Sequence, residues 1–240
     1  MEQQNLFGTP VFKIDKPIRL IELFAGIGAQ AKALQNIGAD FERYRVVEIE
    51  PLVVKTYNAV HGTNFVPLDI TKISGDDLGV RERERFCYIM TYSFPCQDLS
   101  VAGNQKGMEK GAGTRSGLLW EVERLLNELG ENLPQVLLME NVSQVHGTKN
   151  MPDFIKWIHY LSKKGYSSFY KDLSATDFGI PQSRTRCFMV SILGDWEYHF
   201  PEPQPLKTKL SDLLEEDVPE YFFVNSKDAD LLLEKLRNES

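Results

Sequence analysis

One cysteine of this chain stands in a setting suited to nucleophilic chemistry. Cys96 lies in the segment SFPCQDLS at 93–100, which follows an apolar run and opens a long glycine-rich stretch. Ligands of open α/β sheets bind outside the carboxyl ends of the strands, so a thiol placed there faces substrate rather than the core. Cys87 and Cys187 lie within or at the start of strand-like runs, and we interpret them as small buried hydrophobes.

Ionisable residues also follow or precede other strand-like runs. Glu140 directly follows the apolar run 135–139, where a carboxylate serves either as a structural anchor or as a group tuned for proton chemistry. Arg184 and Arg186 are separated by one residue just before a strand, so their side chains are expected to point the same way. The forked donors of arginine suit a phosphate or the carbonyl oxygen of a base.

A third arrangement indicates a cofactor. The first strand-like run leads into FAGIG at 24–28, and Glu48 ends the next strand twenty positions after Gly28. Glycines in such a turn let the backbone approach a ligand closely, and an acid at the second strand end accepts the hydroxyls of a ribose. With Ala31 the run also satisfies the looser pattern of nicotinamide-binding turns, and a simple tight turn between packed elements remains the structural alternative.

The elements that must position these residues alternate between strand and helix. Strands are expected at 18–24, 44–48, 86–92, 135–139, 167–171 and 187–193, and helices at 29–36, 52–60, 118–129 and 154–163. This alternation predicts an α/β fold with a mostly parallel sheet. The glycine-rich segment 93–116 lacks periodicity, and loops of this length are typical of lids and binding loops.

Composition is that of an ordinary globular protein. The 240 residues are 42% hydrophobic and 25% charged, which excludes collagen-like and wholly disordered chains. No apolar run approaches the roughly 20 residues of a membrane span, so we expect a cytoplasmic protein. Three cysteines without a CxxC pair and four scattered histidines indicate neither a disulfide framework nor a zinc site, so no metal is expected.

The net charge of −7 is unevenly distributed. Residues 201–240 hold ten acids and five bases, which leaves the first 200 residues nearly neutral. A local basic cluster is enough for a nucleic-acid contact, and Lys106, Lys110 and Arg115 in the glycine-rich loop could supply one, although three such residues are also ordinary for a solvated loop. We expect one domain over 1–195, followed by an acidic segment over 196–240.

Taken in order, these motifs resemble the DNA cytosine carbon-5 methyltransferase family. The resemblance runs from Arg19 to Leu193 and rests on seven elements: FAGIG at 24–28, Glu48, the pair Asp69 and Ile70, FPCQ at 94–97, RSGLLW at 115–120, MENV at 139–142 and QSRTR at 182–186. It implies a Rossmann-like methyltransferase fold, with a mixed, mostly parallel sheet and helices on both faces. It also implies S-adenosylmethionine as cofactor, whose ribose accounts for Glu48 without a nicotinamide.

The resemblance also implies roles for individual residues. Cys96 would add to carbon 6 of a cytosine flipped out of the duplex, Glu140 would protonate the ring, Arg186 would hold the cytosine carbonyl oxygen and Arg184 the neighbouring pocket and backbone. Glu48 would bind the ribose and Asp69 the adenine amine. The implied cofactor residues are Phe24, Ala25, Gly26, Ile27, Gly28, Glu48, Ile49, Asp69, Ile70, Pro95 and Leu118. The family often has an aromatic residue where this chain has Ile49, so the Ile49 contact with adenine is expected to be weaker.

The resemblance stops short of the family's carboxyl-terminal third. Single-chain members continue into a target-recognition domain and a final motif, neither of which is found here, so we expect double-stranded DNA and a second polypeptide as partners, unless the chain is a fragment. The expected function is cytosine methylation, as the catalytic part of a restriction–modification or phage enzyme. The alternatives are a catalytically silent cofactor- or DNA-binding subunit, an RNA cytosine methyltransferase, and a nicotinamide oxidoreductase, which would leave FPCQ, ENV and QSRTR unexplained.

Overall fold

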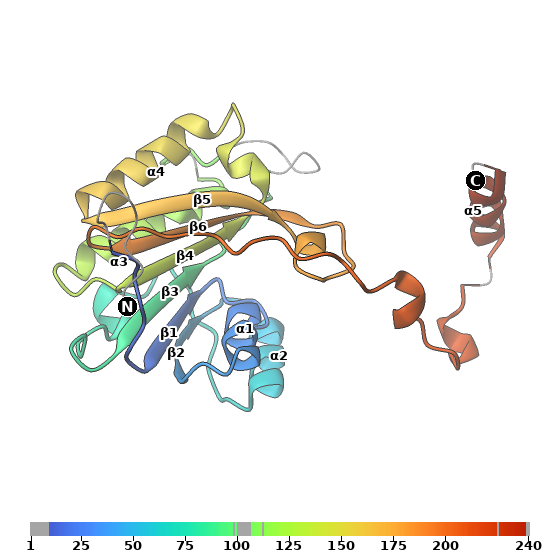
Figure 1. Ribbon diagram of the computed structural model, residues 1–240, viewed down its shortest axis with the longest axis horizontal. Coiled ribbons are helices and arrows are strands. Elements are labelled where there is room, and N and C mark those ends of the chain that lie inside the picture. The colour runs from blue at the N-terminus through green and yellow to red at the C-terminus, as the bar shows by residue number, and fades with distance from the viewer. Residues whose placement is uncertain (1–9, 98, 100–106, 112, 225, 239–240) are drawn as a thin grey trace.

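A single mixed sheet organises the molecule (Figure 1). The computed structural model describes residues 10–97, 99, 107–111, 113–224 and 226–238. Within them the sheet has six strands in the order β2-β1-β3-β4-β6-β5. The strands are β1 (Ile18–Leu23), β2 (Phe41–Val47), β3 (Cys87–Tyr92), β4 (Val136–Asn141), β5 (Tyr166–Ser174) and β6 (Thr185–Leu193).

Strand direction brings the predicted motifs to one edge of the sheet. Strands β1 to β4 are mutually parallel, whereas β6 runs antiparallel to both β4 and β5. The carboxyl ends of β1, β2, β3 and β4 therefore meet at the same edge as the amino-terminal end of β6. This arrangement confirms the predicted mixed, mostly parallel sheet and is the reason that motifs far apart in the sequence share one site.

Four strands extend beyond their predicted limits, and one of them, β6, begins two residues early at Thr185. β2 begins at Phe41 because its first residues pair with the start of β1, where Ile18 lies opposite Phe41. β4 continues through Asn141, so Glu140 lies inside the strand. β5 runs on to Ser174 as an edge strand with an exposed polar stretch, and its pattern carries little apolar signal. Pairing with a neighbouring strand, rather than local periodicity, fixes these ends.

Helices cover both faces of the sheet, as predicted. The α-helices are α1 (Ala29–Asn36), α2 (Pro51–His61), α3 (Leu119–Glu128), α4 (Met151–Lys163) and α5 (Lys227–Asn238). Leu125 of α3 and Trp157 of α4 are buried in the larger core against Met90 of β3. Ala31 of α1 is buried against Leu20 on the opposite face. Short 3₁₀ helices occupy Gly75–Leu78, Ser116–Leu118, Ser143–His146, Ala175–Asp177, Leu210–Leu213 and Glu220–Phe222.

The packed body extends slightly beyond the predicted boundary at residue 195. Trp196, Tyr198 and Phe200 pack against the core on the α1 side, and the Trp196 ring lies edge-on to Phe12 with centroids 5.1 Å apart. A strap after β6 thus closes a face of the sheet that would otherwise expose apolar residues. The acidic segment separates from the body only after this strap.

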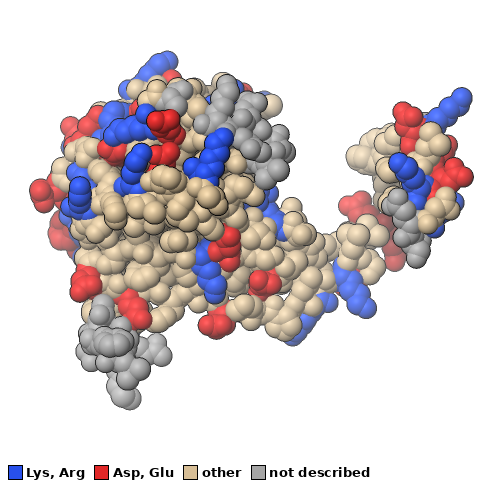
Figure 2. Space-filling model, turned by 90° about the horizontal axis from the view of Figure 1, so that it is seen from above, with Lys and Arg blue, Asp and Glu red and all other residues tan. Residues whose placement is uncertain are grey.

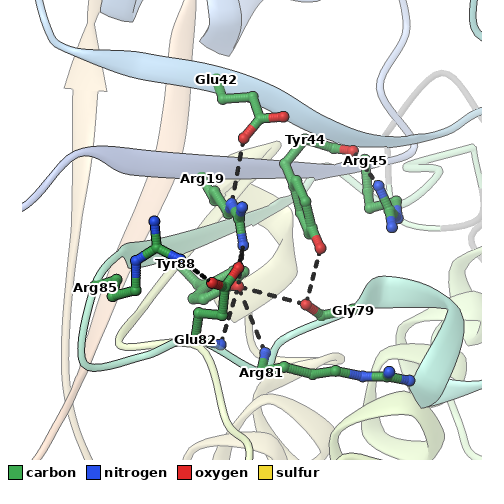
Figure 3. Close-up of polar contacts among 9 residues, drawn as sticks. All are labelled: Arg19, Glu42, Tyr44, Arg45, Gly79, Arg81, Glu82, Arg85 and Tyr88. Carbon is green, nitrogen blue, oxygen red and sulfur yellow. Dashed lines mark hydrogen bonds and ion pairs between the residues drawn. The ribbon is translucent and has the colours of Figure 1, made fainter.

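A cluster of charged and aromatic residues fastens the amino-terminal ends of the strands (Figure 3). The Arg19 guanidinium lies 3.7 Å from the centre of the Phe86 ring and forms ion pairs of 3.2 Å with Glu42 and 2.7 Å with Glu82. It also donates to the Tyr88 hydroxyl at 2.9 Å. Because Arg19 is shielded from solvent, stacking and ion pairing act together here. This end of the sheet is a structural anchor, opposite the end that carries the motifs.

The segment after residue 205 contrasts with the body. It projects away as two short 3₁₀ helices and α5, and it stands apart in two perpendicular views (Figures 1 and 2). None of the residues in these three helices is buried. None of the helices in the described part of the chain has the length and apolarity that a membrane crossing requires.

Candidate active site

The loop that carries Cys96 is held from two sides. Asn141, at the end of β4, donates its side-chain amide to the Phe94 carbonyl at 3.0 Å. The Ser116 hydroxyl donates to the Pro95 carbonyl at 2.7 Å. These bonds fix the backbone immediately before Cys96, whose side chain is only partly buried. The thiol therefore lies at the strand end, partly buried against the main core.

Glu140 and the two arginines lie together in one cavity. This cavity, of about 280 Å³, is lined by Glu140, Leu173, Ser174, Ala175, Phe178, Arg184, Arg186, Phe188 and Pro201. The Arg186 Nε lies 3.3 Å from Glu140 Oε1, and roughly a quarter of each side chain is exposed. Arg184 and Arg186 point into the same cavity, which agrees with the prediction from their spacing. Cys96 is not among its lining residues, so the structure does not bring the thiol and the acid into one cavity.

A second cavity collects most of the predicted cofactor residues. Its volume is about 250 Å³, and it is lined by Phe24, Val47, Glu48, Ile49, Leu68, Asp69, Ile70, Ser93, Pro95 and Leu118. Seven of the eleven residues predicted for the cofactor therefore surround one space. Pro95 lines this cavity and is the residue before Cys96, so the cavity reaches the loop that carries Cys96.

Glu48 is held by backbone donors at the mouth of the second cavity. Glu48 Oε2 accepts the Gly26 N–H at 3.0 Å, and Oε1 accepts the Glu50 N–H at 3.1 Å. An ionised carboxylate has further acceptor capacity on each oxygen, so Glu48 can still bind two hydroxyls of a ligand. The hydrogen bond from Gly26 also joins the FAGIG turn to the end of β2, so it fixes the position of Glu48 relative to that turn.

Asp69 is fixed in a similar way. Its Oδ1 accepts the Thr71 hydroxyl at 2.8 Å and the Thr71 N–H at 3.0 Å. These hydrogen bonds, with Lys72 nearby, lower the pKa of Asp69 below its ordinary value. The carboxylate is thus a charged acceptor inside the cavity, which suits an exocyclic amine.

The four remaining predicted cofactor residues do not line the second cavity. They are Ala25, Gly26, Ile27 and Gly28. Gly28 has a φ of +82°, and a Cβ there would lie 2.2 Å from Nε2 of His61 at the end of α2. The glycine is therefore required by close packing of the turn against α2, in addition to any role in ligand approach. Ala25 is buried and Ile27 is exposed.

Sequence analysis missed a buried acid behind the first turn. Glu22 is fully buried in β1, where it accepts the Ala31 N–H at the start of α1 and the Tyr57 hydroxyl of α2. Burial raises the pKa of Glu22 and, together with Glu22 itself, that of Tyr57. Glu22 ties α1 and α2 to the strand that carries FAGIG. The signal was present, because a lone acid interrupts the apolar run IRLIEL.

The other cysteines and the predicted basic cluster are placed as follows. Cys87 and Cys187 are buried, as predicted, and burial raises the pKa of their thiols to about 11 and about 12. Lys110 pairs with Glu123 at 2.7 Å, and Arg115 donates to Gln97 at 2.7 Å. Lys106 lies outside the described residues.

Comparison with known proteins assigns these features to a class of enzymes. Type II methyltransferase M2.ScrFI of Lactococcus lactis subsp. cremoris is 34% identical over 87% of this chain and 71% of its own. M.HhaI of Haemophilus parahaemolyticus is 33% identical over 88% of this chain and 61% of its own. A model of the C-5 cytosine-specific DNA methylase family matches residues 18–238. The chain belongs to this family.

Solved structures show the same fold. The Dnmt2 methyltransferase of S. pombe aligns with a TM-score of 0.69 at 24% identity, over 88% of this chain and 64% of its own. The Entamoeba histolytica methyltransferase EhMeth gives a TM-score of 0.70 at 22% identity, over 86% of this chain and 62% of its own. The predicted Rossmann-like methyltransferase fold is confirmed.

Membership settles the choice of cofactor. The methyl donor of the family is S-adenosylmethionine, as predicted, and the nicotinamide interpretation is wrong. The acid-lined cavity fits such a molecule, because the carboxylates of Glu48 and Asp69 offer it hydrogen-bond acceptors. The chain spans about 61 to 71% of the length of the two curated relatives described above.

Proposed function

We propose that this chain catalyses methyl transfer from S-adenosylmethionine to carbon 5 of cytosine in DNA through a covalent Cys96 adduct. The observation that carries the proposal is the nucleophile loop. Its Pro95 lines the acid-lined cavity, while Asn141 ties the loop to β4, the strand that carries Glu140 into the other cavity. A methyl donor in the first space would adjoin the loop of Cys96, and a base in the second would adjoin the strand that Asn141 ties to that loop.

Each residue type matches a requirement of the chemistry. Carbon 5 of cytosine becomes nucleophilic only after the Cys96 thiolate forms a bond to carbon 6. Glu140 donates a proton to the ring nitrogen beside the exocyclic amine and so stabilises the charge that this addition creates. Bound S-adenosylmethionine supplies an electrophilic methyl group to carbon 5. Loss of the carbon-5 proton to a base, return of the ring-nitrogen proton to Glu140 and cleavage of the bond to sulfur then restore the ring and release the Cys96 thiolate.

The cavity lined by Glu140, Arg184 and Arg186, which we call the base pocket, must rearrange when a cytosine enters. Glu140 and Arg186 contact each other at 3.3 Å, so each satisfies the other in the absence of a base. A flipped cytosine offers Arg186 a carbonyl oxygen. It offers the lone pair of a ring nitrogen to Glu140, which takes up a proton from solvent as the ion pair separates. Flipping costs a few kcal/mol, and contacts of this kind offset it.

We further infer that the exposed terminal segment binds the part of the enzyme that recognises the target sequence. Tyr221, Phe222 and Phe223 are more than half exposed, and Leu232 and Leu236 form an exposed apolar edge on α5. Such a surface suits a protein partner better than DNA, because the segment is also acidic. The recognition part lies either on a second polypeptide or on a continuation of this one.

The relatives support a biological setting. Those described above bear the name type II methyltransferase, which favours a role in a restriction–modification system and a cytoplasmic location beside the DNA. Phage-encoded modification would use the same chemistry.

The proposal is tested with S-adenosylmethionine labelled in its methyl group. The chain, combined with its recognition part, is incubated with mixed genomic DNA or with RNA, and the labelled nucleosides are identified. We expect 5-methylcytosine in DNA. Label only in RNA would favour an RNA methyltransferase, whereas cofactor binding without label in either polymer would favour a catalytically silent subunit.

The same assay tests the role of the terminal segment. Phosphate contacts alone give sequence-independent binding, typically with a Kd of ~0.1 mM to 1 μM. We therefore expect the 240-residue chain alone to show little or no methylation of duplex DNA, and activity to appear when the recognition part is added. Robust sequence-specific methylation by the chain alone would contradict this inference.

A further inference from the structure

Three residues with metal-binding side chains meet on the face of the sheet opposite the base pocket. They are His146 in the 3₁₀ turn after β4, Asp172 in β5 and Cys187 in β6. A ring nitrogen of His146, the Cys187 Sγ and a carboxylate oxygen of Asp172 all lie within 4.8 Å of one another. None of the three has a part in the proposed methyl transfer.

The backbone fixes this cluster. Asp172 and Cys187 are directly opposite each other in the antiparallel pair β5 and β6, so their side chains leave the sheet on the same face. The neighbouring Arg186 points to the other face, into the base pocket. His146 approaches the pair from the turn after β4, and its Nε2 lies 2.9 Å from Asp172 Oδ1.

The surroundings provide both access and orientation. About a quarter of the His146 side chain and a third of the Asp172 side chain are exposed, whereas Cys187 is fully buried beneath them. The centroid of the His146 ring lies 5.5 Å from that of Tyr170 and 6.1 Å from that of Phe154. These two rings limit the rotation of the imidazole. The imidazole and the carboxylate are therefore partly open to solvent, and the thiol is buried.

The ligand types select a class of metal. One sulfur, one imidazole nitrogen and one carboxylate oxygen suit Zn²⁺ and related ions, whereas Mg²⁺ and Ca²⁺ prefer oxygen ligands alone. Ligands bound to one zinc ion at about 2.0 to 2.3 Å lie roughly 3.5 Å apart, so the widest pair of this cluster closes by about 1 Å at most. The Asp172 side chain and the His146 turn are the parts that can move.

We propose that His146, Asp172 and Cys187 bind one Zn²⁺ ion, with a solvent molecule as fourth ligand. Binding forms a bond from zinc to the Cys187 sulfur and releases the thiol proton to solvent, and the metal takes the place of the contact between His146 and Asp172. The ion then joins β5, β6 and the turn after β4. Arg186 lies on β6, and Glu140 lies on β4 just before the turn, so zinc steadies the frame of the base pocket without touching the base.

The test uses Co²⁺ as a spectroscopic substitute for zinc. The chain carries Cys96→Ser, so that the accessible thiol does not bind metal, and a reductant without thiols is present. We expect one equivalent of Co²⁺ to give tetrahedral d–d bands and a thiolate-to-cobalt charge-transfer band, both removed by Zn²⁺. Absence of the charge-transfer band at saturating Co²⁺ would overturn the proposal.

Variants identify the ligands. Cys187→Ser should abolish the charge-transfer band, whereas the matched control Cys87→Ser, at the other buried cysteine, should keep it. Asp172→Asn and His146→Gln alter partly exposed residues and should each weaken Co²⁺ binding by about tenfold or more. Circular dichroism confirms that each variant is folded. If Cys187→Ser does not fold, unchanged Co²⁺ affinity in both Asp172→Asn and His146→Gln would overturn the proposal.

Discussion

The two cavities at the carboxyl ends of the parallel strands differ in how their charged residues are held. The cavity lined by Glu48 and Asp69 is the cofactor cavity. Glu48 is held there by N–H donors of Gly26 and Glu50, and Asp69 by the Thr71 hydroxyl. In the base pocket, Glu140 and Arg186 come from neighbouring antiparallel strands and satisfy each other. In the proposed function, the first cavity binds its ligand without rearrangement, whereas the second exchanges an internal ion pair for contacts with a base.

This difference separates binding from chemistry. A change in the cofactor cavity should alter the affinity for S-adenosylmethionine and leave the reacting groups in place. A change at the nucleophile or in the base pocket should alter methyl transfer and leave that affinity intact. The predictions that follow test this separation in order of decreasing effect.

The largest effect is expected at the nucleophile. Cys96→Ser should reduce methyl transfer by roughly 10³-fold or more, because the alcohol is a much weaker nucleophile than the thiolate. Calorimetric titration should show S-adenosylmethionine binding within a small factor of the wild type. Cys87→Ser is the matched control and should retain activity. Undiminished transfer by the Cys96→Ser enzyme would remove Cys96 from the mechanism.

Glu140→Gln should produce the next largest loss. The amide cannot donate an acidic proton to the ring, so methyl transfer should fall by roughly 10²- to 10⁴-fold. Affinity for S-adenosylmethionine should not change, since Glu140 does not line the cofactor cavity. The exposed Glu131→Gln serves as control. A large loss of cofactor affinity in Glu140→Gln would show that the two cavities are coupled.

Glu48→Ala should have the opposite effect, a loss of cofactor affinity with little change in the chemistry at the base. Loss of charge-assisted bonds to the ribose should weaken S-adenosylmethionine binding by about 1.5 to 3 kcal/mol. Glu48→Gln keeps an acceptor for the Gly26 N–H and should have a smaller effect. Covalent adduct formation at saturating cofactor should be nearly normal in both variants. Cofactor affinity equal to that of the wild type in Glu48→Ala would place the ribose elsewhere.

Glu22 should give a small pH-dependent effect on stability. Burial raises its pKa above the ordinary value of 4.5, so the folded state binds this proton more tightly than the unfolded state. The contribution of Glu22 is therefore fully present below about pH 4.5 and is lost as pH rises through the raised pKa. Denaturant unfolding at a series of pH values should show this decline in wild type and not in Glu22→Gln. Parallel pH profiles would contradict it.

The fold and most of the site could be predicted because their signals are local. FAGIG followed by Glu48 and the apolar strand before Cys96 each occupy a short stretch of sequence, and the motif order identified the family. Glu140 was expected just beyond its strand but lies within it, because pairing with β6 extends β4. Local periodicity contains no information about such a partner.

Features built from distant residues were missed for the same reason. Glu22 depends on Tyr57, which lies 35 positions away, and His146 meets Asp172 across 26 positions. Neither spacing belongs to a recognisable pattern, so the histidines looked scattered and no metal was expected. Only the register of β5 against β6 brings Asp172 and Cys187 together.

The most direct test of the central claim is covalent trapping. The enzyme, complete with its recognition part, is mixed with S-adenosylmethionine and duplex DNA that carries 5-fluorocytosine at the target position. Fluorine cannot leave as a proton does, so the bond between Cys96 and carbon 6 should persist, and a complex stable to denaturation should map to the peptide that contains Cys96. An enzyme that methylates ordinary DNA yet forms no such complex, or forms it equally well with Cys96→Ser, would contradict the account.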